Sequence, residues 1–191
     1  MNEKEVLKVF KSEKALLAGH FLLSSGLHSP HYMQCALLLQ KPWIAEKLCK
    51  ALAKKLKGIK VDAVIGPALG GVVVSYEMGR ALKVRSLFTE RVDGAMVLRR
   101  GFSLKNNERV LVVEDVVTTG KSTREVIQIV NQQGAKLAGV ASIVDRSDGS
   151  VFFETKLLSL LKIDIKTYPA DNCPLCKEAK ILVIKPGSRA V

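Results

Sequence analysis

Apolar residues along this chain follow two alternating spacings, one typical of helices and one typical of buried strands. Ile44, Leu48, Leu52 and Leu56 recur every four residues, which predicts one face of a helix. Residues 110–113, Val-Leu-Val-Val, instead form a short continuous apolar run, which is typical of a strand that is buried on both faces. Glycine or proline stands at several borders between such segments and marks turns there.

The same criteria predict an order of elements for the whole chain. Helices are expected at residues 2–17, at 41–58, from the glycine-rich turn at 66–71 to about residue 82, and at 122–133. Strands are expected at residues 20–23, 32–35, 61–67, 85–90, 110–113 and 136–144, and residues 157–168 supply one or two more. The polar, basic residues 91–107 are expected to leave the core as an excursion. Strands that alternate with helices predict parallel βαβ units and an open α/β sheet.

Composition and charge limit the class of protein without deciding it. The chain has 191 residues, 48% hydrophobic and 25% charged, which suits a single globular domain spanning 1–191. No apolar run is long enough to span a bilayer, and residues 1–5 lack the character of a signal peptide, so we expect a cytoplasmic protein. The net charge of +12 favours anionic partners, small polyphosphates or nucleic acid, although a lysine-rich solvated surface also explains it.

The segment after residue 113 concentrates polar groups where a strand is expected to end. Ligands of open α/β sheets bind at the carboxyl ends of strands. Glu114 and Asp115 are adjacent carboxylates that accept hydrogen bonds from vicinal hydroxyls or hold waters on Mg²⁺. The residues that follow open a helix and offer backbone N–H groups and hydroxyls to a phosphate: Thr118, Thr119, Gly120, Lys121 and Ser122. Ribose 5-phosphate, with hydroxyls at one end and phosphate at the other, fits both halves.

Two other interpretations compete with a ribose-phosphate site. Residues 120–122, Gly-Lys-Ser, resemble the end of a nucleotide P-loop, G-x-x-x-x-G-K-[ST]. That pattern requires glycine at position 115, where this chain has Asp115, so the P-loop is excluded. The other alternative is an ordinary helix start, capped by Thr or Ser after an acidic turn. Because the apolar strand, the two acids and Thr-Thr-Gly occur in register, we favour the ribose-phosphate site.

These residues carry a resemblance to a known family. Residues 110–122 resemble the phosphoribosyl-diphosphate signature of type I phosphoribosyltransferases, and the whole chain is similar to orotate phosphoribosyltransferases. The wider likeness rests on residues 19–32 with their Ser-Gly-x-His-Ser turn, residues 66–71, residues 143–146 and residues 185–189. The resemblance implies an open, mainly parallel sheet flanked by helices. It also implies a small N-terminal hood, built from about residues 1–40 and the C-terminal segment.

The resemblance implies a reaction and assigns residues to it. Phosphoribosyl would pass from 5-phosphoribosyl 1-diphosphate to a ring nitrogen of orotate, giving orotidine 5′-monophosphate and diphosphate in pyrimidine (UMP) biosynthesis. The donor would be held by Glu114, Asp115, Val116, Val117, Thr118, Thr119, Gly120, Lys121 and Ser122. Backbone N–H groups of Ala68, Leu69, Gly70 and Gly71 would hold its diphosphate, unless these residues form only an ordinary βα turn. Mg²⁺ would bind mainly to the donor, with at most waters between it and Glu114 and Asp115.

Orotate is assigned by the resemblance to Thr118, Arg146, Ser25 and Gly26. Arg146 suits this role because a guanidinium pairs bidentately with a carboxylate, and orotate carries one. The alternative for Arg146 is a weak surface ion pair with Asp145 or Asp148. Two other functions stay open: a type I transferase that acts on a purine base, and a donor-sensing regulator that binds nucleic acid. A neutral purine would give Arg146 no carboxylate, and we find no helix-turn-helix or RNA motif.

The cations that assist the leaving diphosphate are harder to assign. The resemblance implies a loop that closes over the site and reaches the neighbouring subunit, which implies a homodimer. Residues 91–102 of the expected excursion suit that loop, with Arg91, Arg99 and Arg100 as its cations. The alternative is a basic hairpin on the surface. Better-known members carry Lys and His in this loop and lysine at the positions of Ser24 and Gly70, none of which is present here.

The histidines and cysteines suggest metal binding only weakly. His28 and His31 are three residues apart, and we expect turn and packing roles for them and for His20. Cys173 and Cys176 have the spacing of a metal knuckle, but a zinc ribbon needs two such pairs. Cys35 or Cys49 could complete a site only through folding. We therefore favour packing or a redox-sensitive thiol pair over structural zinc.

Overall fold

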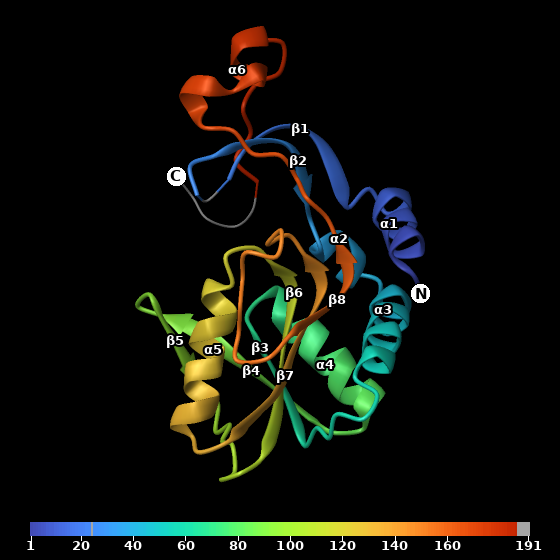
Figure 1. Cartoon of the computed structure of the whole chain (residues 1–191), viewed down its shortest axis with the longest axis vertical. Helices are drawn as coiled ribbons and strands as arrows, with labels where there is room; N and C mark the ends of the chain where they lie inside the picture. Colours follow the sequence, from blue (N-terminus) through green and yellow to red (C-terminus); the bar gives the residue numbers. More distant parts are fainter. Residues whose placement is uncertain (24, 187–191) are drawn as a thin grey trace.

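The computed structural model describes residues 1–23 and 25–186, and its main element is a six-stranded sheet (Figure 1). The strands lie in the order β5-β4-β3-β6-β7-β8. Their bounds are β3 (Ala63–Pro67), β4 (Arg85–Val92), β5 (Ala95–Leu98), β6 (Arg109–Val117), β7 (Lys136–Asp145) and β8 (Leu157–Lys162). All neighbouring pairs are parallel except β4 and β5 at one edge. The predicted open, mainly parallel sheet is confirmed.

Helices cover both faces of this sheet (Figure 1). The helices α3 (Pro42–Lys55) and α4 (Gly70–Leu82) pack on one face, and α5 (Lys121–Gln132) packs on the other. Alternate residues of β6 serve the two faces: Leu111 and Val113 join the core under α3 and α4, whereas Val110 and Val112 join the core under α5. This explains why the run at 110–113 is apolar without interruption.

The order of the strands places a ligand site between β3 and β6. After β3 the chain crosses through α4 to β4 on one side, and after β6 it crosses through α5 to β7 on the other. Because neighbouring crossovers depart in opposite directions, the carboxyl ends of β3 and β6 form the switch point at which open α/β sheets bind ligands. The glycine-rich turn and the acidic segment of the sequence are the two loops at this point.

A hood stands above the carboxyl ends of the strands (Figure 1). It contains the antiparallel hairpin of β1 (Leu16–Leu22) and β2 (His28–Met33), with α1 (Glu3–Ser12) before it and α2 (Ala36–Leu39) after it. The C-terminal segment adds a 3-10 turn, η1 (Ala170–Asn172), and the short helix α6 (Pro174–Glu178). Isolated bridges tie this segment to the hairpin, His28 to Tyr168 and Phe21 to Ile184. No helix in the described part of the chain combines the length and apolar character needed to cross a bilayer.

The structure corrects the predicted bounds of several elements. The first helix ends at Ser12 rather than at residue 17, because Lys14 adopts a left-handed φ of 53° and Leu16 and Leu17 pair with β2. A capping box between Asn2 and Glu5 fixes its start. Residues 163–168 form no regular strand beyond the bridge at Tyr168, so the segment 157–168 supplies one strand. The predictions for α3, α4, α5 and β7 are confirmed to within about three residues.

Part of the predicted excursion at 91–107 belongs to the sheet. Asp93 and Gly94 both have positive φ, 48° and 83°, and form a tight turn between β4 and β5. Beyond this turn, Met96, Leu98 and Phe102 pack against the core under α5. Apolar side chains at alternate positions therefore return the chain to the sheet, and the arginines between them had hidden this pattern.

Candidate active site

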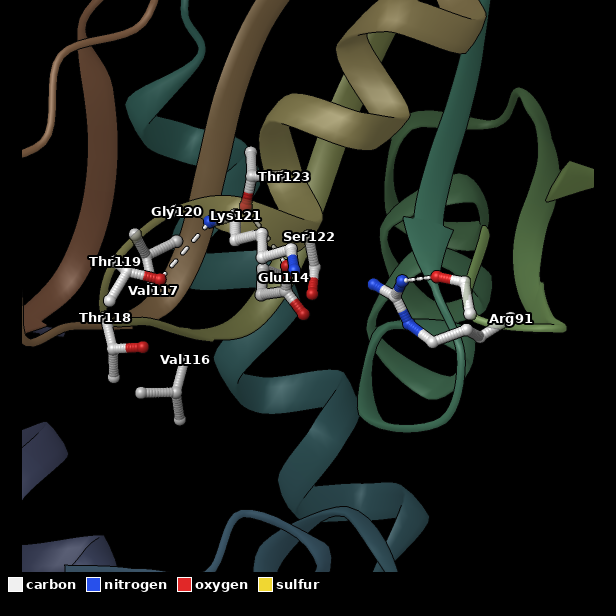
Figure 2. A pocket seen from close by; sticks show the side chains of 11 residues that line it. Arg91, Glu114, Val116, Val117, Thr118, Thr119, Gly120, Lys121, Ser122 and Thr123 are labelled. Atoms are coloured by element: carbon white, nitrogen blue, oxygen red, sulfur yellow. Dashed lines mark hydrogen bonds between the residues drawn. The ribbon is translucent and has the colours of Figure 1, made fainter. Parts of the chain in front are cut away.

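A pocket of about 430 Å³ lies where β6 ends and α5 begins (Figure 2). Arg91 and Gly94 of the β4–β5 hairpin form one wall. The other lining residues are Glu114, Val116, Val117, Thr118, Thr119, Gly120, Lys121, Ser122 and Thr123. The structure thus gathers most of the residues that the sequence assigned to the phosphoribosyl donor. Asp115, Arg146, Ser25 and Gly26 do not line this pocket.

The start of α5 has the shape of an anion-binding cradle. Gly120 precedes the helix with a φ of 70°, and a Cβ atom there would lie 2.8 Å from the side chain of Val151 and 3.0 Å from Phe153. Glycine is therefore required for the turn to pack closely. The first turn of α5 directs its amino end and the positive end of the helix dipole into the pocket, together with the hydroxyls of Thr119 and Ser122. This arrangement suits a phosphate.

The two carboxylates sit at the inner end of the same loop. Burial, and then the charge of Asp115, raise the pKa of Glu114 to about 8, and Thr123 opposes the shift by donating a hydrogen bond of 3.1 Å to Glu114 Oε2. Burial also raises the pKa of Asp115, although backbone N–H groups oppose it. Two desolvated acids side by side favour a ligand that brings hydroxyl donors or a cation to them.

The Glu114 carboxyl should make the ligand-free protein less stable as the pH rises. Its pKa of about 8 in the folded state exceeds the value of about 4.3 for an unfolded chain, so the folded state holds a proton that the unfolded state releases. The extra proton stabilises the folded state. This stabilisation is complete at a pH below the pKa of Glu114 in the unfolded chain, and it is lost as the pH rises through the pKa in the folded state. We expect the melting temperature to fall between pH 5 and pH 8.5, and to fall less in Glu114→Gln. Calorimetry without donor or Mg²⁺ measures the melting temperature of both proteins across this pH range. If the melting temperature depends on pH equally in wild type and Glu114→Gln, the prediction is wrong.

The loop after β3 approaches the acids closely. A Cβ atom on Gly70 would lie 2.5 Å from Asp115 Oδ2, and a Cβ atom on Gly66 would lie 2.5 Å from the carbonyl oxygen of Gly71. The Ala68–Leu69 peptide bond in this loop is cis. The structure therefore brings the loop assigned to diphosphate into direct contact with the acidic loop. A lysine in place of Gly70 would require the Asp115 carboxylate to turn away from its position here.

Arg146 lies at the end of β7, close to residues of the hood. Its backbone N–H donates to the Val117 carbonyl oxygen at 2.8 Å, which fixes it beside the acidic loop. Burial lowers the pKa of Arg146, while negative charge on Tyr32 and Cys35 would raise it. Its Nε is buried, and no described residue accepts a hydrogen bond from it. The Asp145 carboxylate instead accepts from the Ser147 backbone and hydroxyl, at 2.9 and 2.6 Å, so the predicted alternative of an Asp145–Arg146 ion pair is not formed.

Tyr32 is a candidate site residue that sequence reasoning missed. It comes from β2 of the hood, and burial followed by the charge of Asp115 raises the pKa of its hydroxyl, while Arg146 lowers it. The hood thus brings a hydroxyl within electrostatic range of a carboxylate and a guanidinium that come from the sheet. The only signal in the sequence was that Tyr32 ends the segment 19–32 on which the family resemblance rests.

The other predicted residues are only partly brought to the pocket. Ser25 and Gly26 form the exposed tip of the β1–β2 hairpin, where the Gly26 N–H donates to the Leu23 carbonyl oxygen at 2.9 Å. Ser24 lies outside the described residues. Among the three arginines, Arg91 lines the pocket and pairs with Glu125, whereas Arg100 pairs with Glu90 over the ring of Phe88. Arg99 is exposed beyond β5, away from the pocket wall.

A mainly parallel sheet with an acidic loop and a helix amino end at its switch point is the arrangement of a type I phosphoribosyltransferase. Residues 38–171 match the family model described as a phosphoribosyl transferase domain. The orotate phosphoribosyltransferase of Carboxydothermus hydrogenoformans is 56% identical over 97% of both chains, and that of Caldicellulosiruptor saccharolyticus is 53% identical over the full length of both. This chain belongs to the orotate phosphoribosyltransferase family.

Solved structures show the same fold. The orotate phosphoribosyltransferase of Aeropyrum pernix superimposes with a TM-score of 0.70 at 27% identity, over 83% of this chain and 93% of that one. The adenine phosphoribosyltransferase of Thermoanaerobacter pseudethanolicus reaches a TM-score of 0.61 at 18% identity, over 70% and 88%. Because enzymes named for different bases share the fold, the fold alone does not select the acceptor.

Proposed function

We propose that this protein transfers phosphoribosyl from 5-phosphoribosyl 1-diphosphate to orotate, forming orotidine 5′-monophosphate and diphosphate. The observation that carries the proposal is the pocket in which the partly buried Glu114 carboxyl group and the amino end of α5 face a single ligand volume. Glu114 and Asp115 would accept hydrogen bonds from the ribose hydroxyls. Residues 118–122 would bind the 5-phosphate through backbone N–H groups and hydroxyls. Membership of the family supports the same assignment.

The acceptor would lie between the donor loop and the hood. Arg146 offers a partly buried guanidinium whose Nε has no acceptor among the described residues, so a carboxylate on the base would complete its hydrogen bonds. A ring nitrogen of orotate would attack the anomeric carbon of the donor as the bond between that carbon and the diphosphate oxygen breaks. The proton of the ring nitrogen would pass to the departing diphosphate or to solvent. Positive charge develops on the ribose in such a transition state. The Asp115 carboxylate would stabilise that charge, and so would Glu114 once the bound donor and cation favour its ionised form.

Mg²⁺ is part of the proposal. The described residues offer Glu114 and Asp115 as the acids nearest the donor, and hard oxygen donors of this kind suit Mg²⁺ with intervening waters. Bound to the donor, the ion would neutralise charge that builds on the leaving diphosphate. Of the three predicted loop cations, Arg91 is the one in position to assist, because it lines the pocket. The homodimer and the cytoplasmic location stay predictions.

A spectrophotometric assay tests the proposed reaction. Orotate loses its characteristic ultraviolet absorbance when its ring nitrogen is glycosylated, so turnover with donor and Mg²⁺ should be visible directly. Parallel reactions with adenine, guanine and hypoxanthine test the purine alternative. We expect turnover with orotate and none with the three purines. Turnover with a purine and none with orotate would contradict the proposal, and steeply salt-dependent RNA binding without any turnover would favour the regulator instead.

A further inference from the structure

Four side chains that bind transition metals meet between the hood hairpin and the C-terminal segment. His20 comes from β1, His28 from β2, and Cys173 and Cys176 from the start of α6. One ligand atom of each lies within 4.8 Å of the others, although 153 residues separate His20 from Cys173. We propose that these four side chains bind one Zn²⁺ ion as a structural site that joins the C-terminal segment to the hood.

The distances between the ligand atoms suit a tetrahedral ion. With Zn–S near 2.3 Å and Zn–N near 2.0–2.1 Å, a regular tetrahedron has N···S edges of about 3.6 Å and N···N edges of about 3.4 Å. Cys173 Sγ and Cys176 Sγ lie 3.6 and 3.7 Å from His20 Nε2, and Cys176 Sγ lies 3.3 Å from His28 Nδ1. His20 Nε2 and His28 Nδ1 are 2.8 Å apart, so binding would separate them by about half an ångström.

The surroundings of His20 orient it as a metal ligand. Its Nδ1 lies 3.1 Å from the carbonyl oxygen of Ile181, and donation to that oxygen leaves the lone pair of Nε2 directed at the cluster. The pairing of β1 with β2 shifts register between Ala18 and Phe21, around His20. Irregularities of this kind redirect a side chain out of the regular alternation. A backbone carbonyl that fixes the tautomer of a histidine is a common partner in metal sites.

Apart from backbone hydrogen bonds to the hairpin at Tyr168 and Ile184, the C-terminal segment has few contacts that hold it in place. From residue 166 to 186 only Cys173 is buried, and Ile181, Leu182, Val183 and Ile184 are all exposed. The helix α6 has five residues and η1 has three, which is too short for either to be stable alone. Segments without a hydrophobic core are commonly fixed by disulfides or metal ions. A zinc ion would supply this link, and the exposed side of Cys176 gives the ion a path of entry.

The donor set selects zinc and a structural role. Two thiolates and two imidazoles favour Zn²⁺ over Mg²⁺, which prefers oxygen ligands. Four protein ligands leave no open position for water or substrate, as in structural rather than catalytic zinc sites. In the sequence, the Cys-x-x-Cys pair and the histidines lie far apart. In the fold, Cys173 and Cys176 join His20 and His28 to form one complete Cys₂His₂ set.

Metal analysis of the full-length protein tests the proposal. The protein should be purified without a polyhistidine tag and without chelators, and its metals measured by plasma mass spectrometry. We expect about one zinc per chain, and less than about a tenth of that in the Cys173→Ser/Cys176→Ser double variant. Cys49→Ala is the matched control, because Cys49 is a buried cysteine outside the cluster, and it should keep the zinc.

A second measurement avoids variants that fail to fold. Wild-type protein is stripped with a chelator under reducing conditions and then supplied with Zn²⁺ or Mg²⁺. Zinc alone should raise the melting temperature and slow proteolysis within residues 166–186, and Co²⁺ in its place should give the strong visible absorption of a tetrahedral thiolate site. The proposal would be overturned if wild-type protein were purified without metal and added zinc changed neither its melting temperature nor its proteolysis. The proposal would also be overturned if the site held iron, or if Cys173 and Cys176 formed a disulfide in protein kept under reducing conditions. Zinc retained by the double cysteine variant would overturn it as well. Orotate turnover is not a readout here, so this test is independent of the proposed function.

Discussion

Asp115→Asn should lower kcat/KM for the phosphoribosyl donor by about 100-fold. The carboxylate is partly buried at the end of β6, where it would accept a hydrogen bond from a ribose hydroxyl and face the positive charge that develops on the ribose. The amide keeps the shape and one acceptor oxygen but loses the charge. Charge-assisted hydrogen bonds of this kind contribute about 1.5–3 kcal/mol, and low local dielectric strengthens the effect in the transition state. Steady-state kinetics with the donor varied at saturating orotate and Mg²⁺ measures the loss.

The position of Asp115 makes the prediction specific to the donor. Gly70 leaves room for the carboxylate, so the asparagine can occupy the same volume and the fold should be retained. Asp164→Asn is the matched control, because Asp164 is exposed and outside the pocket. It should have wild-type kinetics, and both variants should melt close to wild type. If Asp115→Asn keeps its kcat/KM for the donor, Asp115 does not bind the ribose.

The main sheet could be predicted because local patterns and tertiary packing agree in it. The four-residue spacing from Ile44 to Leu56 predicts α3, and the apolar run at 110–113 predicts the central strand β6. The acids and glycine after that run were also visible in the sequence, since all the lining residues of the pocket except Arg91 and Gly94 come from one contiguous segment. A site formed by contiguous residues needs only the local fold to be correct.

Elements of the hood were harder to predict because distant residues stabilise them. Residues 13–17 continue the helical spacing of α1, but pairing of Leu16 and Leu17 with β2 takes them into a strand. The helix α6 is too short to show a period. The neighbourhood of Tyr32 and Arg146, and the cluster of His20 with Cys173, join residues more than 100 positions apart. Such contacts depend on how the hood packs on the sheet, which periodicity does not specify.

Arg146 distinguishes an orotate enzyme from a purine enzyme, because orotate has a carboxylate for the guanidinium to bind and a neutral purine has none. Substitution of Arg146 should therefore change which acceptor is used. Arg146→Ala should lower kcat/KM for orotate by roughly 100-fold, chiefly through a higher KM, because loss of a bidentate guanidinium–carboxylate pair costs a few kcal/mol in a partly buried site. The KM for the donor should change little. Kinetics with each substrate varied in turn measure both effects. An unchanged orotate KM would remove Arg146 from the site.

Uracil gives the sharpest version of this test, because it is orotate without the carboxylate. Wild-type protein should prefer orotate strongly, whereas Arg146→Ala should lose most of that preference while its low activity with uracil stays nearly constant. Arg146→Lys keeps the positive charge but not the planar guanidinium. Its preference for orotate over uracil should therefore lie between those of wild type and Arg146→Ala. If the guanidinium acts only in packing, orotate and uracil activities would fall together in Arg146→Ala. A collapse of the orotate-to-uracil ratio requires that the side chain contact the carboxylate itself.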